Sequence, residues 1–345
     1  MSTSRLPLLP ASCHERRTFC AAGACLTISA LLGGCSNTGH GHAYDRLYSP
    51  TQITRLNGVY FIVDCWHHRI LYSQDVRLPL ARWRLLDDDL AGPHSIDTDG
   101  KLYVAEDTGR HRLKVYRARP RGGFELIQIV GQVGVRPHRV LYDPPHQQFL
   151  IMGSEDQSLH ALVRGPQGLR PAFSLHIPEL NGEYCRSITL HGDLLYFVAV
   201  THLVIYRRDG HRFRFTGQRL PIRALQGFQH GHGSNDLFFL DQRRGILTAT
   251  PNRAFLFNHL MQLVDGTAQD ISHHFRGTPY YLSVFDGQLW FATAKAYSAI
   301  SRIAFPDLGP KTLDARNLGL MHRETLFDIG PANQASLDRR QQLPQ

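Results

Sequence analysis

The sequence predicts an all-β protein assembled from about six copies of one small antiparallel sheet. The stretches 50–71 and 93–115 share one pattern of proline, turn glycine, aspartate and arginine at an offset of 43 residues. An apolar segment like the one at 59–64 occurs six times between residues 59 and 294. A period of roughly 40–45 residues with several short strands per repeat is typical of a propeller blade. We therefore expect a six-bladed β-propeller of four-stranded antiparallel blades.

The stretch 92–116 shows how one repeat is expected to fold. A first short strand covers 93–98, and the Asp-Gly pair at 99–100 is expected to form a hairpin turn because glycine accepts a positive φ. A second strand at 102–105 is rich in residues with high β-propensity. A third strand at 111–116 alternates apolar and polar residues, as a half-buried strand should.

The other repeats keep the hydrophobic pattern of this unit. The expected second strands are 59–64, 102–107, 149–154, 195–200, 237–241 and 289–294. The expected outermost strands are 81–86, 124–130, 171–176 and 211–217. These outer segments are more polar than the second strands, which is typical of an exposed sheet edge.

Three places depart from this regular repeat. The fifth unit is expected to begin near 225–229, so that 237–241 is its second strand. Residues 252–277 break the rhythm, and we expect an outer strand there and a short helix near 271–275. Residues 44–48 could add a strand to the last blade and so close the ring.

The two best-preserved repeats resemble NHL-type six-bladed propellers. Those repeats open with a proline-containing inner strand, followed by a glycine turn, a strand that ends in aspartate and an Asn/His-Arg-Ile/Leu run. Residues 50–71 and 93–115 carry this pattern, and the resemblance extends over about 45–325. It implies the fold and not the function, because one fold hosts many activities.

The N-terminal 34 residues are predicted to be a signal peptide. Arg16-Arg17 precedes a mildly apolar run at 19–34, which looks like a twin-arginine translocation signal. Leu32-Gly33-Gly34-Cys35 resembles a bacterial lipobox, which implies lipidation of Cys35. The alternative is an uncleaved anchor helix, but the run is shorter than the roughly 20 residues that span a bilayer. We expect a periplasmic protein of a Gram-negative bacterium, anchored to a membrane through its lipid.

This export prediction sets the rest of the domain layout. Residues 35–43 are expected to be a linker, 44–325 the propeller and 326–345 a polar tail.

The formal net charge is +9, and charged residues make up 19% of the chain, which is typical of a globular protein. Basic residues are scattered and not interleaved with aromatic residues, and export excludes nucleic acid as a partner. Cys65 and Cys185 lie in the first and fourth repeats, so we expect no disulfide between them.

A candidate ligand site is expected at the mouth of the central tunnel, where the innermost strands begin. His94 and His138 each follow a proline at the start of an inner strand, so they should occupy equivalent positions in adjacent blades. The expected site residues are Gln52, His94, His138, Arg186, Gln229 or His230, and Tyr280 or Tyr281.

Three interpretations of this set stay open. His94, His138 and Arg186 could bind an anion, because arginine grips a carboxylate or phosphate with two parallel hydrogen bonds. The partner would then be an anionic small molecule, a cell-envelope polymer or an envelope protein. The same residues could instead be ordinary hydrogen-bonded packing of a wet tunnel.

The third interpretation is a metal site, since neutral imidazoles are good ligands for zinc or iron. The catalytic propeller of peptide α-amidating lyase is similar, with Pro-His openings around a zinc. Here His94 and His138 would be ligands, and His230 or His232 is the candidate third. The protein would then be a metal-dependent lyase or hydrolase, with Arg186 as an electrophilic clamp and Tyr280 or Tyr281 as the acid.

Asp64 and Asp107 are expected to be structural and not catalytic. They occupy equivalent positions in two repeats, each followed by a His-Arg pair, which favours a role in tying turn to strand within a blade. The chain contains no GxSxG or HExxH motif and no phosphate-cradling glycine-rich loop. The sequence therefore predicts no specific catalytic residue.

Overall fold

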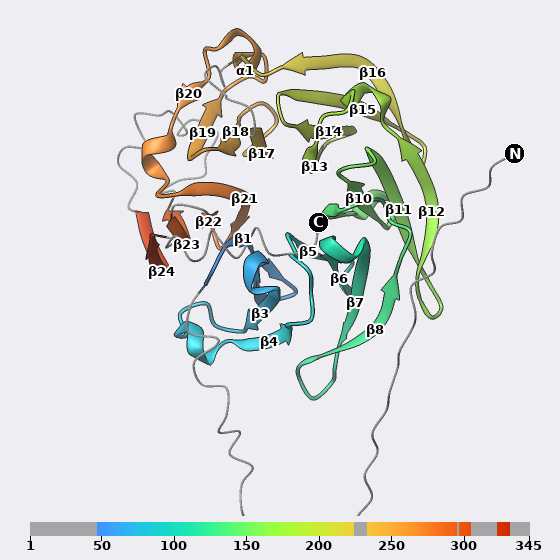
Figure 1. Ribbon diagram of the computed structural model, residues 1–345, viewed down its shortest axis with the longest axis vertical. Coiled ribbons are helices and arrows are strands. Elements are labelled where there is room, and N and C mark those ends of the chain that lie inside the picture. Colours follow the sequence, from blue (N-terminus) through green and yellow to red (C-terminus); the bar gives the residue numbers. More distant parts are fainter. Residues whose placement is uncertain (1–46, 224–232, 295–296, 305–322, 332–345) are drawn as a thin grey trace, which may run out of the picture. The chain divides into compact units, whose positions relative to one another are not determined.

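The computed structural model describes residues 47–223, 233–294, 297–304 and 323–331. These residues form six four-stranded antiparallel sheets that follow one another around a ring in chain order (Figure 1). The prediction of a six-bladed β-propeller is confirmed. None of the helices in the described ranges is long and apolar enough to cross a membrane.

Blades 1 to 3 each run from the tunnel outward along the chain. Blade 1 contains β1 (Pro50–Leu56), β2 (Val59–Asp64), β3 (Arg69–Ser73) and β4 (Arg84–Asp87). Blade 2 contains β5 (Ile96–Thr98), β6 (Leu102–Asp107), β7 (Arg112–Ala118) and β8 (Phe124–Val130). Blade 3 contains β9 (Pro137–Asp143), β10 (Gln148–Gly153), β11 (Ser158–Gly165) and β12 (Gly168–His176).

Blades 4 to 6 keep the same order. Blade 4 contains β13 (Cys185–His191), β14 (Leu194–Ala199), β15 (His202–Asp209) and β16 (Arg212–Pro221). Blade 5 contains β17 (Gly233–Phe239), β18 (Gly245–Thr250), β19 (Arg253–Phe257) and β20 (Gln269–Asp270). Blade 6 contains β21 (Thr278–Phe285), β22 (Gln288–Ala294), β23 (Tyr297–Ala304) and β24 (Arg323–Pro331).

Single helical turns connect some of these strands. The 3₁₀ turns are η1 (Cys65–His67), η2 (Leu80–Arg82), η3 (Thr108–Arg110), η4 (Pro144–His146), η5 (Pro178–Leu180) and η7 (Ser272–His274). A four-residue α-helix, α1 (Gln262–Asp265), precedes the short strand β20. The turn η7 lies within the predicted helix at 271–275.

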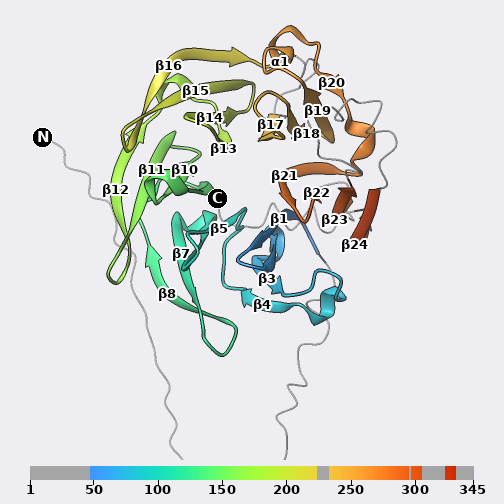
Figure 2. The same ribbon diagram turned by 180° about the vertical axis from the view of Figure 1, so that it is seen from behind.

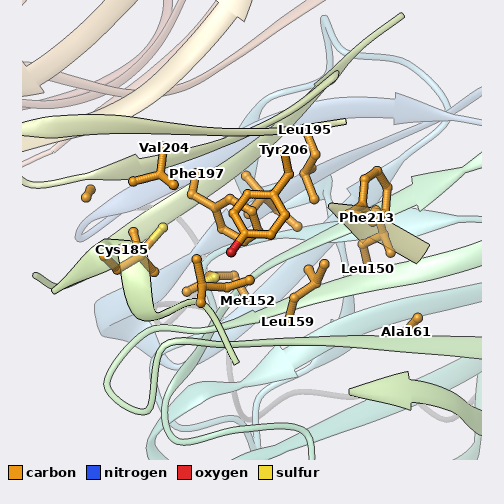
Figure 3. Packing of buried hydrophobic residues seen from close by; sticks show 14 residues of the cluster. Leu150, Met152, Leu159, Ala161, Cys185, Leu195, Phe197, Val204, Tyr206 and Phe213 are labelled. Atoms are coloured by element: carbon orange, nitrogen blue, oxygen red, sulfur yellow. The ribbon is translucent and has the colours of Figure 1, made fainter. Parts of the chain in front are cut away.

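The hydrophobic core lies between neighbouring blades, because side chains alternate between the two faces of each sheet. In β14, Leu195 and Phe197 pack against blade 3, while Tyr196 and Val198 pack against blade 5. Figure 3 shows the first of these layers, where Leu195 and Phe197 lie over Met152 and its neighbours. A strand buried on both faces reads as a continuous apolar run, which is why the second strands are so recognisable in the sequence.

The prediction for blade 5 is wrong by one strand. The segment 237–241, expected as the second strand, lies at the end of the first strand β17 and in the turn that follows it. Inner and second strands are both buried, so a short apolar run does not distinguish them. The predicted opening strand at 225–229 falls outside the described residues.

The ring closes by packing of blade 6 against blade 1. Strands β21 and β22 contact β1, and β21 and β1 lie side by side in both views (Figures 1 and 2). Of the predicted closing strand at 44–48, residues 44–46 fall outside the described residues, and 47–48 are not in a strand. Leu47 is instead buried against Trp290 and Ile300 of blade 6.

The last strand of blade 6 crosses the predicted end of the propeller. Strand β24 pairs with β23 and extends to Pro331, beyond the boundary placed at 325. As the outermost strand of its sheet, β24 pairs with a neighbour on one side only. Amino-acid composition alone did not distinguish residues 326–331, which belong to β24, from the predicted tail.

Asp64 and Asp107 have the predicted structural role. The Asp64 carboxylate accepts hydrogen bonds from the backbone N–H groups of Tyr48 and Ser49, at 2.9 and 3.1 Å. The Asp107 carboxylate accepts one from Ala91 at 2.6 Å. Each carboxylate also pairs with the arginine five residues further on. Both aspartates thus tie the second strand to the segment that leads into the same blade.

The histidine of each His-Arg pair links one blade to the next. His68 and His111 have positive φ values of 56° and 54°. Their Nδ1 atoms accept hydrogen bonds from the backbone N–H groups of Gly92 and Arg136, at 3.0 and 2.9 Å. The repeated motif therefore connects neighbouring blades. Its histidines, His68 and His111, do not line the tunnel mouth.

Candidate functional site at the tunnel mouth

A β-bulge near the start of the inner strand sets the geometry of the mouth. In five blades the pairing of the first two strands shifts register by one residue there. In the remaining blade, blade 2, the equivalent position lies just before the inner strand β5. A bulge re-aims side chains that strict alternation would send to opposite faces. The residues at this position, one per blade, are Thr51, His94, His138, Arg186, Asn235 and Tyr280.

These six residues line one cavity of about 350 Å³, to which all six blades contribute. Residues just before or beside the inner strands complete the wall, among them Trp66, Arg136 and Tyr184. No aspartate or glutamate is among the described residues that line the cavity. A cavity of this size falls at the lower end of the range for small-molecule sites.

Four of the predicted site residues meet in this cavity, namely His94, His138, Arg186 and Tyr280. Gln52 lies one position further along its strand, where its Oε1 accepts a hydrogen bond from the Ile96 backbone at 2.8 Å. It therefore joins blades 1 and 2, and Thr51 takes its place in the cavity wall. The prediction for Gln52 missed the bulge, which displaces the register by one residue.

The fifth blade supplies Asn235 in place of the predicted Gln229 or His230, both of which fall outside the described residues. Asn235 was missed because the first strand of this blade was predicted at 225–229, whereas the structure has it at Gly233–Phe239. Arg136 and Tyr184 were missed because they precede the inner strands, although each stands directly before the residue that opens the strand. No sequence signal marks these three residues, because the bulges that align the strand openings appear only in the structure.

The rings of His94 and His138 lie against each other, with centroids 3.6 Å apart and an interplanar angle of 38°. The Nε2 atom of His94 lies 3.7 Å from the Cys65 sulfur, and its Nδ1 lies 3.4 Å from the Thr108 hydroxyl. Burial, together with the charge of the Arg136 guanidinium, lowers the pKa of His94 to about 3. This imidazole is therefore neutral at pH 7.

His138 reaches across the ring to blade 6. Its Nε2 atom lies 2.7 Å from the Tyr280 hydroxyl, and its Nδ1 lies 3.4 Å from the Tyr184 hydroxyl. Burial, followed by the neighbouring His94 and Arg186, lowers the pKa of His138 well below its usual value. Both imidazoles therefore act as hydrogen-bonding groups and not as cations.

Positive charge in the cavity comes from two arginines. Nη1 of Arg186 donates to Oδ1 of Asn235 at 3.0 Å and to the Gly233 carbonyl at 3.3 Å. Arg186 makes no ion pair with a carboxylate in the part of the chain that the structure describes. Nε of Arg136 lies 3.4 Å from a carboxylate oxygen of Glu155. The least compensated charge at the mouth is therefore that of Arg186.

A second layer of buried side chains contacts the residues of the cavity wall. The Tyr281 hydroxyl lies 2.8 Å from the carbonyl oxygens of both His138 and Arg186, on the opposite side of the ring. The guanidinium of Arg139 lies over the Tyr281 ring, 4.1 Å from its centroid. Tyr281 is fully buried and is not among the residues that line the cavity, so this predicted site residue supports the cavity wall from behind it.

Buried carboxylates accompany Arg139 in this layer. Glu106 is fully buried and accepts hydrogen bonds from the backbone N–H and the hydroxyl of Ser95, at 2.7 and 2.5 Å. Burial raises the pKa values of Glu106 and Asp236, and Arg139 partly offsets that rise. The sequence signal for this layer is Glu106, an acidic residue inside the apolar run 102–106. The predicted site did not include it.

The ring nitrogens of the two histidines are engaged with protein atoms in the described residues. All four ring nitrogens of His94 and His138 face a protein sulfur or oxygen atom within 3.7 Å. No group of three or more metal-ligating His, Cys, Asp or Glu side chains occurs in the ranges that the structure covers. The third candidate ligand, His230 or His232, falls outside them. The two thiols, Cys65 and Cys185, form no disulfide.

Fold and site together define a six-bladed β-propeller with a ligand-sized cavity at the tunnel mouth. No protein-family model and no curated protein sequence matches the chain, so the NHL-type resemblance stays a prediction.

Comparison with solved structures supports the propeller fold. A putative 6-phosphogluconolactonase from Bacteroides fragilis is 14% identical, with a TM-score of 0.57 over 82% of this chain and 85% of that one. A protein from Lactobacillus plantarum is 13% identical, with a TM-score of 0.57 over 83% and 86%. A putative 6-phosphogluconolactonase from Bacteroides uniformis is 12% identical, with a TM-score of 0.54 over 82% and 87%. At such identities the likeness concerns the fold alone.

Proposed function

We propose that this protein is an exported, lipid-anchored β-propeller that binds an anionic ligand at the mouth of its central tunnel. The observation that carries the proposal is Arg186, a guanidinium in the cavity wall that pairs with no described carboxylate. A cavity lined by guanidinium, imidazole and hydroxyl groups, with no carboxylate among its described residues, favours a negatively charged occupant.

The size of the cavity favours a small molecule over a polymer or a protein partner. A volume of about 350 Å³ suits a ligand that enters whole, whereas a polymer or protein would present only a terminal group. The asparagine that holds Nη1 of Arg186 orients the guanidinium before the ligand arrives. Such preorganisation lowers the entropic cost of binding.

Export and anchoring are proposed on the sequence of residues 1–35, which lie outside the described range. The twin arginines at 16–17 and the lipobox-like 32–35 support transport to the periplasm and lipidation of Cys35. The ligand would then be met in the cell envelope.

A thermal-shift screen of anionic, neutral and cationic metabolites tests the proposal. Anions are expected to raise the melting temperature of the wild-type protein, because a ligand that binds only the folded state stabilises it. The effect should be lost in Arg186→Gln and reduced in Arg186→Lys, which keeps the charge but loses the planar fork. Arg170→Gln, at an exposed arginine of β12 outside the cavity, is the matched control. An anion effect that survives in Arg186→Gln would reject the proposal.

The alternative proposal is a metal-dependent lyase or hydrolase at the same mouth. It requires a third ligand from outside the described residues and a rearrangement of His94 and His138, whose nitrogens already face protein atoms. Burial raises the pKa values of Tyr280 and Tyr281, which makes either phenol a poor proton donor at neutral pH. Zinc or iron at one equivalent in protein purified without a histidine tag, and lost in His138→Ala, would favour this alternative.

A further inference from the structure

We propose that the ligand of this cavity is a singly charged carboxylate on a flat, largely apolar body, and not a phosphate dianion. This inference rests on the anion site proposed above. Two arginines supply the fixed charge of the wall, and Glu155 lies within ion-pair distance of one of them, Arg136. Arg186 alone has no described carboxylate partner. The described wall therefore presents about one uncompensated positive charge.

The two histidines add no charge to that balance. The titratable and charged groups that face the two rings are Cys65, Arg136, Arg139, Tyr184, Arg186 and Tyr280, and none of them is a carboxylate. The three guanidiniums and the burial of both rings oppose protonation of either imidazole. A second negative charge on the ligand would thus enter a desolvated site without a partner, which is costly.

Aromatic side chains set the shape of the ligand. Trp66, Tyr184 and Tyr280 line the cavity beside the His94–His138 pair. Tyr184 and Tyr280 approach His138 from two blades, with ring centroids 5.6 and 6.2 Å from the imidazole. Rings at these separations favour a planar group, because aromatic faces and edges pack best against flat partners. One carboxylate on such a group would match both the charge and the walls.

The test compares phenylacetate with benzyl phosphate by calorimetric titration of the full mature protein. A carboxylate stays singly charged between about pH 5.5 and pH 8, whereas a phosphate monoester passes from one to two charges near pH 6. The affinity for phenylacetate is expected to stay within about twofold over this range, because the imidazoles stay neutral throughout. The affinity for benzyl phosphate is expected to fall about tenfold as the second charge appears.

Variants separate the class of ligand from the site itself. Arg186→Gln should weaken phenylacetate binding roughly tenfold or more, the usual loss for a charge-assisted hydrogen bond. Arg170→Gln, outside the cavity, should leave it unchanged. Tighter binding of benzyl phosphate at about pH 8 than at about pH 5.5, still dependent on Arg186, would overturn the carboxylate assignment and keep the anion site. Absence of saturable binding of either probe at about 10 mM, or binding that ignores Arg186→Gln, would overturn the anion site as well.

Discussion

His138 and Tyr280 meet across the ring although 142 residues separate them in the chain, and the imidazole Nε2 lies 2.7 Å from the phenol oxygen. One residue begins blade 3 and the other begins blade 6, so their hydrogen bond spans the tunnel mouth. It joins two blades that share no interface, and it places the phenol beside the histidine pair.

Removal of this contact should destabilise the protein. Tyr280→Phe is expected to lower the free energy of unfolding by about 1–2 kcal/mol, because it leaves a buried imidazole nitrogen without its partner. Tyr184→Phe removes a longer contact to the same ring, at 3.4 Å, and should cost less. Urea unfolding of the two variants provides the comparison. Equal losses of unfolding free energy in the two variants would contradict a larger contribution from the His138–Tyr280 hydrogen bond.

The buried histidines should make stability depend on pH. The pKa values of His94 and His138 are lowered in the folded state, so between about pH 6.5 and each folded pKa the unfolded chain binds protons that the folded one does not. Stability is thus full above about pH 6.5 and falls as the pH drops, by up to about 1.4 kcal/mol per pH unit for each ring. Urea midpoints between about pH 7.5 and pH 5 should show this slope.

A matched variant tests the origin of that slope. His138→Gln keeps a hydrogen-bonding side chain but cannot titrate, so it should flatten the dependence. His176→Gln, at an exposed histidine of β12, should not. An unchanged slope in His138→Gln would contradict the assignment to the mouth.

Asp64 should be essential to blade 1 at neutral pH. Although burial raises its pKa, hydrogen bonds and charge from His67, the charge of Arg69 and backbone N–H groups hold the pKa below its usual value. Its contribution is therefore present above about pH 4 and lost as the pH falls through the lower folded pKa. Asp64→Asn is expected to cost roughly 3–5 kcal/mol at pH 7, because it removes the negative charge that lies 2.9 Å from the buried Arg69 guanidinium.

The effect of Asp64→Asn can be measured by urea unfolding at two pH values. Its cost relative to wild type should shrink as the pH falls below about 4 and through the lower folded pKa, where the wild-type carboxylate also becomes neutral. Asp75→Asn, which removes an exposed pair with Arg77, should cost far less. A cost for Asp64→Asn that does not change with pH would reject the electrostatic explanation.

The corrected register of blade 5 can be tested at Gly245, the first residue of β18. A methyl group there would lie 2.6 Å from the Phe238 carbonyl oxygen and would also collide with the Phe257 ring. Gly245→Ala should therefore destabilise the fold by about 1–3 kcal/mol in urea unfolding, as overpacking does. Gly131→Ala, where no atom lies within 4 Å of the added methyl, is the control and should be nearly neutral.

The proposed anchor is tested at Cys35. Cys35→Ala should move the protein from the membrane fraction to the soluble periplasmic fraction, since no acyl chain can then be attached. Fractionation of cells that express each form gives the result. Continued membrane association of Cys35→Ala would contradict lipidation as the means of attachment.

The sequence by itself determined the architecture and part of the site. The 43-residue offset and the recurring apolar segments predicted six blades, because each blade repeats the same burial on two faces. The two Pro-His openings predicted that His94 and His138 would be neighbours, since equivalent positions in adjacent blades are adjacent in space. In the structure their ring centroids are 3.6 Å apart.

Only the tertiary structure decided which residues share the cavity and what state they are in. The β-bulge that turns Thr51 and not Gln52 into the mouth is a local departure from alternation, which has no signature in a hydrophobic pattern. Contacts across the ring, such as that of Tyr281 with His138 and Arg186, join strands that never pair. The neutrality of the histidines depends on burial and on guanidiniums from other blades, so it arises only when all six blades converge.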